Sequence, residues 1–235
     1  MSAQLPLSLR LRPAARFENF VVGSNGELLA QLRAMSQAAR GVGECFLFLR
    51  GRAGSGRSHL MQACCHAVSA RGGRAAYVPL SEHETLQPGL LEGWERFDLV
   101  CLDDVDAIAG RSPWEEALFH LYNQVRESGG RLLASARVAP EALDIGLPDL
   151  LSRLGWGPVY ALEPLDEAGR IEALRLRARY MGLELPGDTV SWLMRHMPRD
   201  LPALLGLLER LDEASLVAQR RLTVPFVKSV LAGKT

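Results

Sequence analysis

The ten residues GRAGSGRSHL, at positions 51–60, restrict the fold of this chain more than any other segment. They match the phosphate-binding loop pattern G-x-x-x-x-G-K-[ST], except that Arg57 stands where the pattern has lysine. Such a loop binds phosphate when it follows a β-strand and opens an α-helix, because its amides and the positive helix end then face the anion. An apolar run from Cys45 precedes the loop and a helical pattern follows it. The sequence therefore predicts a nucleotide-binding α/β domain.

The loop also supplies the expected ligands of the nucleotide. Its glycines let the backbone wrap around a phosphate, and Ser58 offers a hydroxyl to Mg²⁺. Arg57 can pair with phosphate, but its fork is bulkier than an ammonium, so we expect weak intrinsic turnover. Lys228 and Lys234 are the only lysines among 27 basic residues, so Arg57 can also reflect composition. A glycine-rich turn without a ligand is the alternative. The residues expected to contact nucleotide are Gly51, Gly54, Ser55, Gly56, Arg57, Ser58 and His59.

A pair of carboxylates follows the apolar run LVCL, at Asp103 and Asp104. At the end of a strand beside the phosphate loop, Asp103 is placed to hold Mg²⁺ through water. Asp104 stands where many such ATPases have a glutamate that polarises the attacking water. It is one methylene shorter, so we expect it to hold that water badly. The alternative is an acidic turn at the end of a strand.

Five near-continuous apolar runs alternate with helical patterns, which predicts a parallel five-stranded sheet between helices, a three-layer α/β fold. The runs begin at Cys45, Ala75, Phe97, Arg131 and Val159, and the helical patterns cover 27–40, 58–71, 113–128 and 148–154. After Pro164 only helical patterns follow, with Asp166 and Gly182 in capping positions. We therefore expect an exposed flexible tail at 1–16, the α/β domain at 17–163 and a small all-helical lid domain at 164–235.

Charge and composition limit the classes of function. The 27 basic and 27 acidic residues cancel, which argues against unaided DNA binding. No apolar run is long enough to cross a membrane, and arginines interrupt the N-terminal segment, so we expect a cytoplasmic protein. The four cysteines lack metal-ligand spacing and read as buried apolar residues.

Several segments resemble the Hda family, bacterial AAA+ proteins homologous to the ATPase core of the replication initiator DnaA. They are GRAGSGRSHL, LVCLDDVDAIAG, LFHLYNQVRESGGRLL, GLPDLLSRLGWGPVYAL and AQRRLTVPFVKSVL, and ARFENFVVGSNGELLAQL resembles the entry segment of DnaA-type cores. The resemblance covers nearly the whole chain, and an arginine in the phosphate loop is typical of this family. It implies an AAA+ P-loop domain with a helical lid, carrying ADP. It further implies a negative regulator of replication initiation that docks on the DNA-loaded β sliding clamp and promotes ATP hydrolysis by DnaA.

The resemblance assigns further roles. The hexamer QLPLSL matches the clamp-binding pattern, with Gln4 in a polar pocket, Leu7 and Leu9 in an apolar cleft, and Leu5 helping. Arg153, in GLPDLLSRLGWG, matches the arginine finger that acts in trans; the alternative is a surface arginine paired with Asp149. Arg199 matches the lid arginine that reaches the nucleotide. Arg137 departs from the family, which has a polar or acidic nucleotide-sensing residue there, and Ser135 can substitute for it.

Two other readings stay open. A stand-alone AAA+ ATPase, such as a helicase loader or motor, would need Arg57 and Asp104 to work in cis and would not need the clamp-binding tail. A small-molecule P-loop kinase would need an acceptor pocket that the sequence does not indicate. We expect DNA contact only through the clamp, and a nucleotide-dependent homo-oligomer is plausible.

Overall fold

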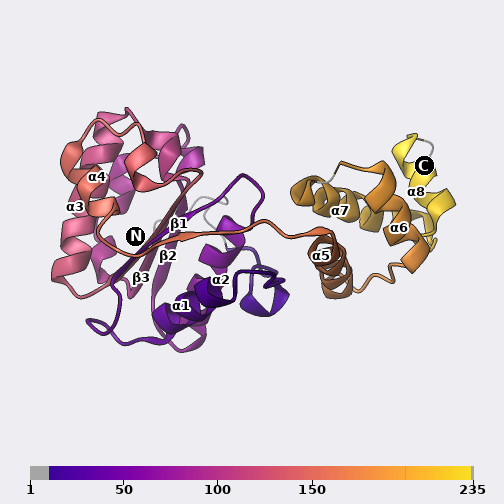
Figure 1. Cartoon of the computed structure of the whole chain (residues 1–235), viewed down its shortest axis with the longest axis horizontal. Coiled ribbons are helices and arrows are strands. Elements are labelled where there is room, and N and C mark those ends of the chain that lie inside the picture. Colours follow the sequence, from indigo (N-terminus) through magenta and orange to yellow (C-terminus); the bar gives the residue numbers. More distant parts are fainter. Residues whose placement is uncertain (1–10, 199, 234–235) are drawn as a thin grey trace. The chain divides into compact units, whose positions relative to one another are not determined.

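The computed structural model describes residues 11–198 and 200–233. The chain divides into two compact units, of which the first ends at Glu163 and the second begins at Pro164. In Figure 1 the first unit contains the sheet and helices α1 to α4, and the second contains helices α5 to α8. Each unit is described by itself.

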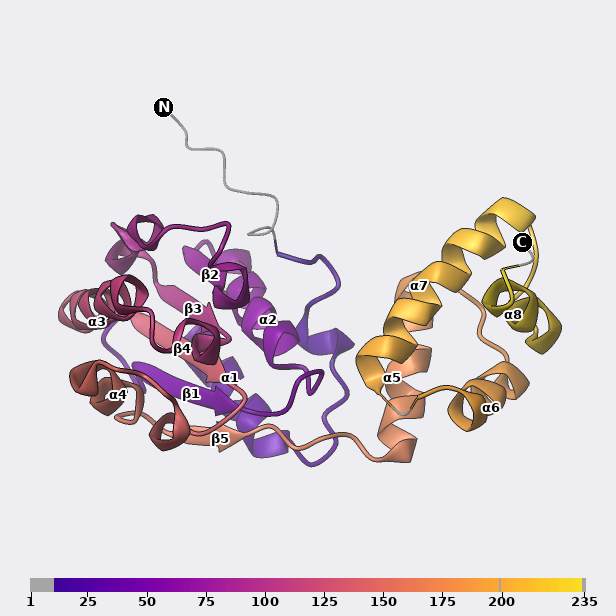
Figure 2. The same cartoon turned by 90° about the horizontal axis from the view of Figure 1, so that it is seen from above.

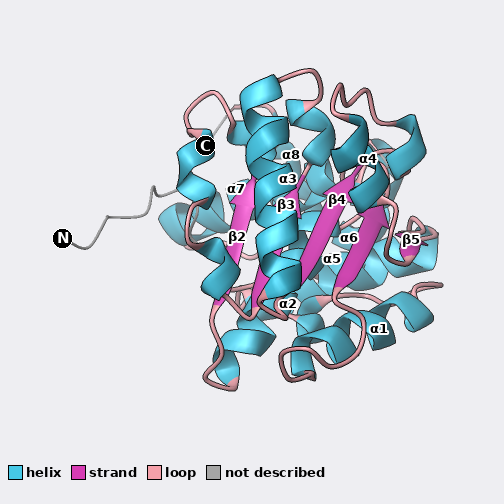
Figure 3. Cartoon of the chain, turned by 90° about the vertical axis from the view of Figure 1, so that its left-hand side faces the viewer, coloured by secondary structure: helices cyan, strands magenta, loops and turns pink. Residues whose placement is uncertain are grey.

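The first unit is built on five parallel strands in the order β2-β3-β4-β1-β5, with β2 at one edge and β5 at the other (Figure 3). Their bounds are β1 Phe46–Arg50, β2 Ala75–Pro79, β3 Leu99–Asp103, β4 Arg131–Ala136 and β5 Val159–Ala161. β3 and β4 are buried along their whole length, as continuous apolar runs require. The prediction of a parallel five-stranded sheet is confirmed.

Helices cover both faces of this sheet, because successive side chains of each strand point to opposite sides. Val100 and Leu102 of β3 pack in one core with α3 (Ser112–Glu127) and α4 (Pro148–Leu154). Leu99 and Cys101 pack in the other core with α1 (Gly26–Gln37) and α2 (Arg57–Ala70). Figure 2 shows the two helical layers on either side of the strands. Short 3₁₀ helices lie at Phe17–Asn19, Leu80–Glu82, Pro88–Leu91, Trp94–Arg96, Val105–Ile108 and Pro140–Ala142.

The segment at 11–16 corrects the expectation of an exposed tail that reaches residue 16. Ala15 is buried and Leu11 packs against the core that contains α2. The amide of Arg12 donates to Gln62 Oε1 (2.8 Å), and His66 Nε2 donates to the carbonyl of Arg12 (3.0 Å). The sequence reading missed this packing, because these bonds use backbone groups that the side-chain pattern does not reveal.

Two element boundaries also differ from the sequence prediction. α1 ends at Gln37 rather than at residue 40, because Ala38 has an extended backbone and its carbonyl accepts a bond from Arg131. β3 begins at Leu99 rather than at Phe97, because the amide of Asp98 bonds to the carbonyl of Arg74 in the turn before β2.

The second unit is entirely helical among its described residues, with α5 Glu167–Tyr180, α6 Gly187–His196, α7 Leu201–Ala218 and α8 Val224–Leu231. The carboxylate of Asp166 caps α5 by accepting from the amide of Gly169 (2.7 Å). A separate apolar core, centred on Leu211, Phe226 and Val227, holds this unit together. In the part of the chain that the structure describes, no helix combines the length and apolar character that a membrane span requires.

Candidate functional site

The phosphate loop joins the end of β1 to the start of α2, as its sequence pattern predicts. Gly54 and Gly56 adopt positive φ angles of +75° and +105°, which favour glycine. A Cβ on Gly56 would lie 2.9 Å from Cε2 of Phe20, so the loop passes close to an aromatic ring as well. Glycine is therefore required at Gly56 for two reasons.

The loop leaves polar groups available to an anion. Among the described residues, no side chain caps the start of α2. The hydroxyl of Ser55 is buried and has no hydrogen-bond partner there. First-turn amides without an intrahelical partner, together with the helix dipole, favour a negatively charged ligand. The loop therefore fits the phosphates of a nucleotide.

Arg57 links the phosphate loop to the end of β3. Its side chain is only 7% exposed, and its Nη2 lies 2.5 Å from Oδ1 of Asp104. Its Nη1 donates to the carbonyl of Gly51 within the same loop. The charge of Arg57 is therefore balanced inside the chain by the carboxylate expected to polarise water. A sequence reading that pairs Arg57 with phosphate alone misses this contact.

Asp103 lies at the end of β3 with 1% of its surface exposed. Tyr77 donates its hydroxyl to Asp103 Oδ2 (2.7 Å), and Ser135 donates its hydroxyl to Asp103 Oδ1 (2.5 Å). Burial raises the pKa of Tyr77 strongly, and the charge of Asp103 adds to the shift, so the phenol stays a donor. Ser58, the other expected Mg²⁺ residue, lies in the first turn of α2, directly after the phosphate loop.

Asp104 has a left-handed backbone, with φ of +57°, and its amide donates to the hydroxyl of Ser135 (3.1 Å). Ser135 thus contacts both carboxylate residues, at the position proposed to substitute for a nucleotide-sensing side chain. Burial raises the pKa of Asp104, repulsion from Asp103 adds to the shift, and the charge of Arg57 opposes it. Arg57 therefore favours the charged form of Asp104, against burial and the charge of Asp103.

Arg137 and His59 have polar partners of their own near this cluster. Arg137 Nε lies 2.5 Å from Oδ2 of Asp106, and this hydrogen bond raises the pKa of an already exposed guanidinium. His59 Nε2 donates to the carbonyl of Arg16 (2.8 Å), and its ring lies 5.7 Å from that of Phe20. His59 therefore helps to fix the entry segment against α2.

Arg153 lies in the last turn of α4. This helix packs on the opposite face of the sheet from α2, the helix that follows the phosphate loop. Its guanidinium carbon lies 4.0 Å from the ring centroid of Trp156, and its Nε is buried without a hydrogen-bond partner. Within residues 11–198 and 200–233, no carboxylate lies within ion-pair distance of it, Asp149 included. The ion pair with Asp149 that the alternative assumes is therefore not formed within these residues.

The remaining predicted residues lie outside the described part of the chain. These are Arg199 of the second unit and the four clamp-binding candidates Gln4, Leu5, Leu7 and Leu9. The sequence reading in turn missed Tyr77, Glu115 and Trp156. Tyr77 lies in the buried strand β2, where the sequence pattern gives no reason to single out one residue. Glu115 lies on α3 and accepts hydrogen bonds from the amides of Gly146 and Leu147, just before α4, and a helical pattern does not reveal such a contact. Trp156 lies in the turn after α4, where the sequence does not show that its ring contacts Arg153.

A phosphate loop between β1 and α2, carboxylates at the end of β3 in the same parallel sheet, and a separate helical unit define an AAA+ protein. Residues 11–161 match the family model of the bacterial DnaA ATPase domain, and residues 166–231 match that of the Hda lid domain. The chain belongs to the bacterial DnaA ATPase family, as a DnaA-like AAA+ protein with an Hda-type lid. The predicted resemblance is confirmed.

Solved structures agree on the fold. Domain III of the Thermotoga maritima replication initiation protein DnaA has a TM-score of 0.80 at 23% identity, covering 95% of this chain and 98% of that one. DnaA from Aquifex aeolicus, bound to AMPPCP, has a TM-score of 0.69 at 23% identity, covering 85% and 65%. The Thermotoga maritima RuvB Holliday junction branch migration motor is more distant, with a TM-score of 0.63 at 14% identity, covering 89% and 69%.

Proposed function

We propose that this chain is a negative regulator of replication initiation. It binds ADP, docks on the DNA-loaded β sliding clamp through Gln4–Leu9, and stimulates ATP hydrolysis by DnaA by supplying Arg153 in trans. The observation that carries the proposal is the state of Arg153, an arginine held against a ring with no carboxylate beside it among the described residues. DNA contact is indirect, through the clamp, and a nucleotide-dependent homo-oligomer remains part of the hypothesis.

The phosphate loop supports the nucleotide part of this proposal. Gly51, Gly54 and Gly56 shape the loop, and the unpartnered hydroxyl of Ser55 is a donor that a phosphate oxygen would satisfy. An AMPPCP-bound DnaA of the same fold shows that a relative binds a nucleotide analogue. ADP requires fewer positive groups than ATP, which suits a loop whose Arg57 is already paired with Asp104.

Ser58 and Asp103 fit a Mg²⁺ ion that keeps water molecules between itself and Asp103. Both carboxylate oxygens of Asp103 already accept hydrogen bonds, so this residue would hold the ion through water, while Ser58 would coordinate it directly. This suits Mg²⁺, which loses its water reluctantly. A bound Mg²⁺ would neutralise phosphate charge.

The Arg153 proposal follows from the chemistry of phosphoryl transfer. Negative charge spreads over the γ-phosphoryl oxygens in the transition state, and an arginine from a neighbouring subunit stabilises it. Arg153 retains the free charge that such a role needs. Arg57, by contrast, is buried and neutralised by Asp104, so it cannot act on a partner.

We expect weak hydrolysis by the chain alone. The purified wild type should turn over ATP well below about one per second, at the low end of enzymatic rates, because Arg57 occupies the carboxylate of Asp104 and because Asp104 is short. The double variant Arg57→Lys with Asp104→Glu should raise this rate roughly tenfold, since a correctly placed base contributes factors of that order or more. Phosphate release without DnaA measures both. A wild-type rate of several per second would contradict the regulator proposal and favour a stand-alone ATPase.

The clamp proposal concerns the N-terminal hexamer. The combined variant Gln4→Ala, Leu7→Ala should weaken binding to the DNA-loaded clamp at least about tenfold, because one buried leucine alone contributes about 1.5–3 kcal/mol. Surface plasmon resonance with immobilised clamp measures the change. Ser8→Ala, in the same hexamer, is the matched control and should bind as wild type does. Unchanged binding by the double variant would place the clamp contact elsewhere.

The whole proposal is tested by one assay. ATP-loaded DnaA is incubated with DNA-loaded clamp, with and without this chain, and conversion of ATP to ADP on DnaA is followed. The expected result is faster conversion only when the chain and the loaded clamp are both present. No acceleration at any concentration would overturn the proposal.

A further inference from the structure

Trp156 is an unusually exposed aromatic residue for its position. It follows the last turn of α4, and 53% of its surface is open to solvent. An exposed tryptophan gives up much of the stabilisation that burial of its ring would supply. Its ring is nevertheless not free, because the guanidinium of Arg153 lies 4.0 Å from its centroid and that of Arg126 lies 5.3 Å from it.

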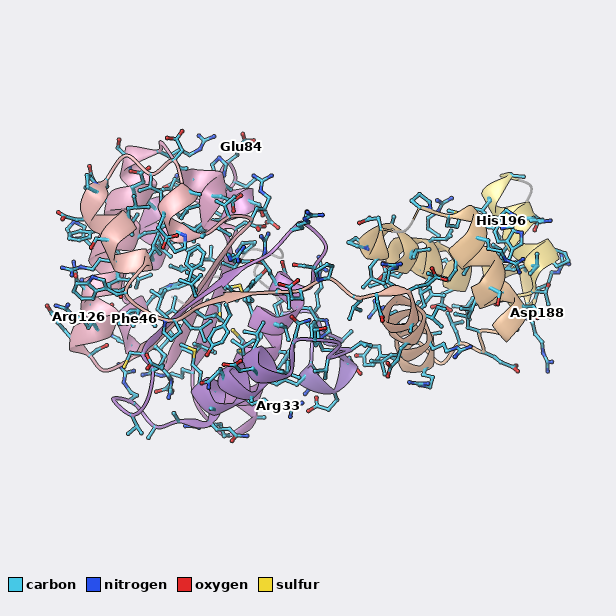
Figure 4. The ribbon with its side chains drawn as sticks, in the orientation of Figure 1. Arg33, Phe46, Glu84, Arg126, Asp188 and His196 are labelled. Carbon is cyan, nitrogen blue, oxygen red and sulfur yellow. The ribbon has the colours of Figure 1, made fainter. Side chains whose placement is uncertain are left out.

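The Trp156 ring is held in place from the core side. Tyr122 of α3 meets it edge to face, with centroids 6.4 Å apart, and Tyr122 stacks on Phe46 of β1 at 4.0 Å. The amide of Trp156 also donates to the carbonyl of Arg153 (3.1 Å). Figure 4 labels Phe46 and Arg126 in this part of the first unit. A row of aromatic rings thus connects strand β1 to Arg153.

We propose that Trp156 is a positioning residue that presents Arg153 to the partner's nucleotide. This inference rests on the proposed trans role of Arg153 and adds the residue that prepares it. A ring face attracts a guanidinium through its quadrupole and leaves the planar fork of N–H donors available. A carboxylate partner such as Asp149 would occupy that fork. The absence of an acid beside Arg153 within the described ranges, and its partnerless Nε, leave the Trp156 ring as the contact that holds it.

The contact with the Trp156 ring restricts where the Arg153 guanidinium can lie. An arginine side chain is flexible, and a catalytic group displaced by about 1 Å can lose about 100-fold in rate. Stacking on a ring that is fixed through Tyr122 and Phe46 restricts Arg153 before DnaA arrives. Trp156 therefore acts through Arg153 and need not touch the nucleotide.

The test compares Trp156→Leu, Trp156→Phe and Arg153→Ala in the DnaA hydrolysis assay with DNA-loaded clamp, over a range of chain concentrations. Trp156→Leu should lower the maximal stimulated rate roughly tenfold while the half-saturating concentration changes by less than about twofold, because positioning rather than docking is lost. Trp156→Phe keeps a ring face and should retain most of the rate. A purely structural role would not separate the rate from the half-saturating concentration or be rescued by phenylalanine.

A second readout does not depend on DnaA. In the folded chain, the Nε–Hε resonance of Arg153 should carry an upfield ring-current shift that disappears in Trp156→Leu and is partly kept in Trp156→Phe. If Arg153→Ala abolishes stimulation but Trp156→Leu leaves the maximal rate unchanged, this inference is overturned and the proposed function stands. If Arg153→Ala also leaves stimulation unchanged, the trans role falls, and this inference with it. An unshifted Arg153 resonance in the wild type would overturn the stacking itself.

Discussion

Replacing Arg153 by alanine is expected to lower the maximal rate of DnaA-bound ATP hydrolysis, in the presence of DNA-loaded clamp, by about 1,000-fold or more. An arginine finger supplied in trans is worth about 10³–10⁵ in rate, because it stabilises the charge that develops on the transferred phosphoryl group. The loss should appear in the maximal rate and not in clamp binding, since Arg153 lies on α4 and the proposed clamp-binding hexamer is a separate segment, at residues 4–9. Arg153→Lys should restore little, because an ammonium lacks the planar fork.

The matched control for Arg153→Ala is Arg33→Ala. Arg33, labelled in Figure 4, is also a cation over an aromatic ring, 4.9 Å from the centroid of Phe17, and it is exposed. It lies on α1, in the layer on the opposite face of the sheet from α4. This control should stimulate hydrolysis as wild type does. Equal losses in the two variants would mean that removing any stacked arginine damages the fold, and the trans role would lose its support.

The sequence predicted the architecture well because its signals are local. Runs such as those of β3 and β4 are apolar at nearly every position, which only strands buried on both faces require. The bounds of α4 follow from Pro148 at its first position and from the glycine after Leu154, and the structure has the same bounds. The phosphate loop carries its own strand, turn and helix context.

The site was less predictable because its decisive contacts join distant segments. Arg57 and Asp104 are 47 residues apart, and their ion pair depends on how the phosphate loop meets the end of β3, two strands away from β1 in the sheet. Ser135 reaches both carboxylate residues only because β4 lies between β1 and β3. No spacing rule in the sequence fixes that strand order. Arg137, at the position of the family's nucleotide-sensing residue, pairs with Asp106, another contact between segments far apart in the sequence.

Glu115→Leu is expected to cause the largest loss of stability, about 3–5 kcal/mol in the free energy of unfolding of the first unit. Glu115 lies on α3 and is 3% exposed. Its Oε1 accepts from the amides of Gly110 (2.7 Å) and Gly146 (3.1 Å), and its Oε2 accepts from the amide of Leu147 (2.9 Å). Leucine would fill the space but remove the acceptor of all three part-buried amide hydrogen bonds. Urea unfolding followed by tryptophan fluorescence measures the loss, since three of the four tryptophans lie in the first unit.

Glu116→Leu supplies the matched control, because Glu116 is the next residue on α3 and is exposed. It should change the free energy of unfolding by no more than about 0.5 kcal/mol, as most surface substitutions do. Glu115→Gln should fall between the two, because an amide keeps one acceptor oxygen but turns its NH₂ group toward a donor. Equal stability of Glu115→Leu and Glu116→Leu would contradict the argument.

Since Leu147 and Gly146 lead directly into α4, the Glu115 carboxylate fixes the start of the same helix whose last turn carries Arg153. Glu115→Gln should therefore lower the maximal rate of stimulated hydrolysis even at urea concentrations at which its first unit remains folded.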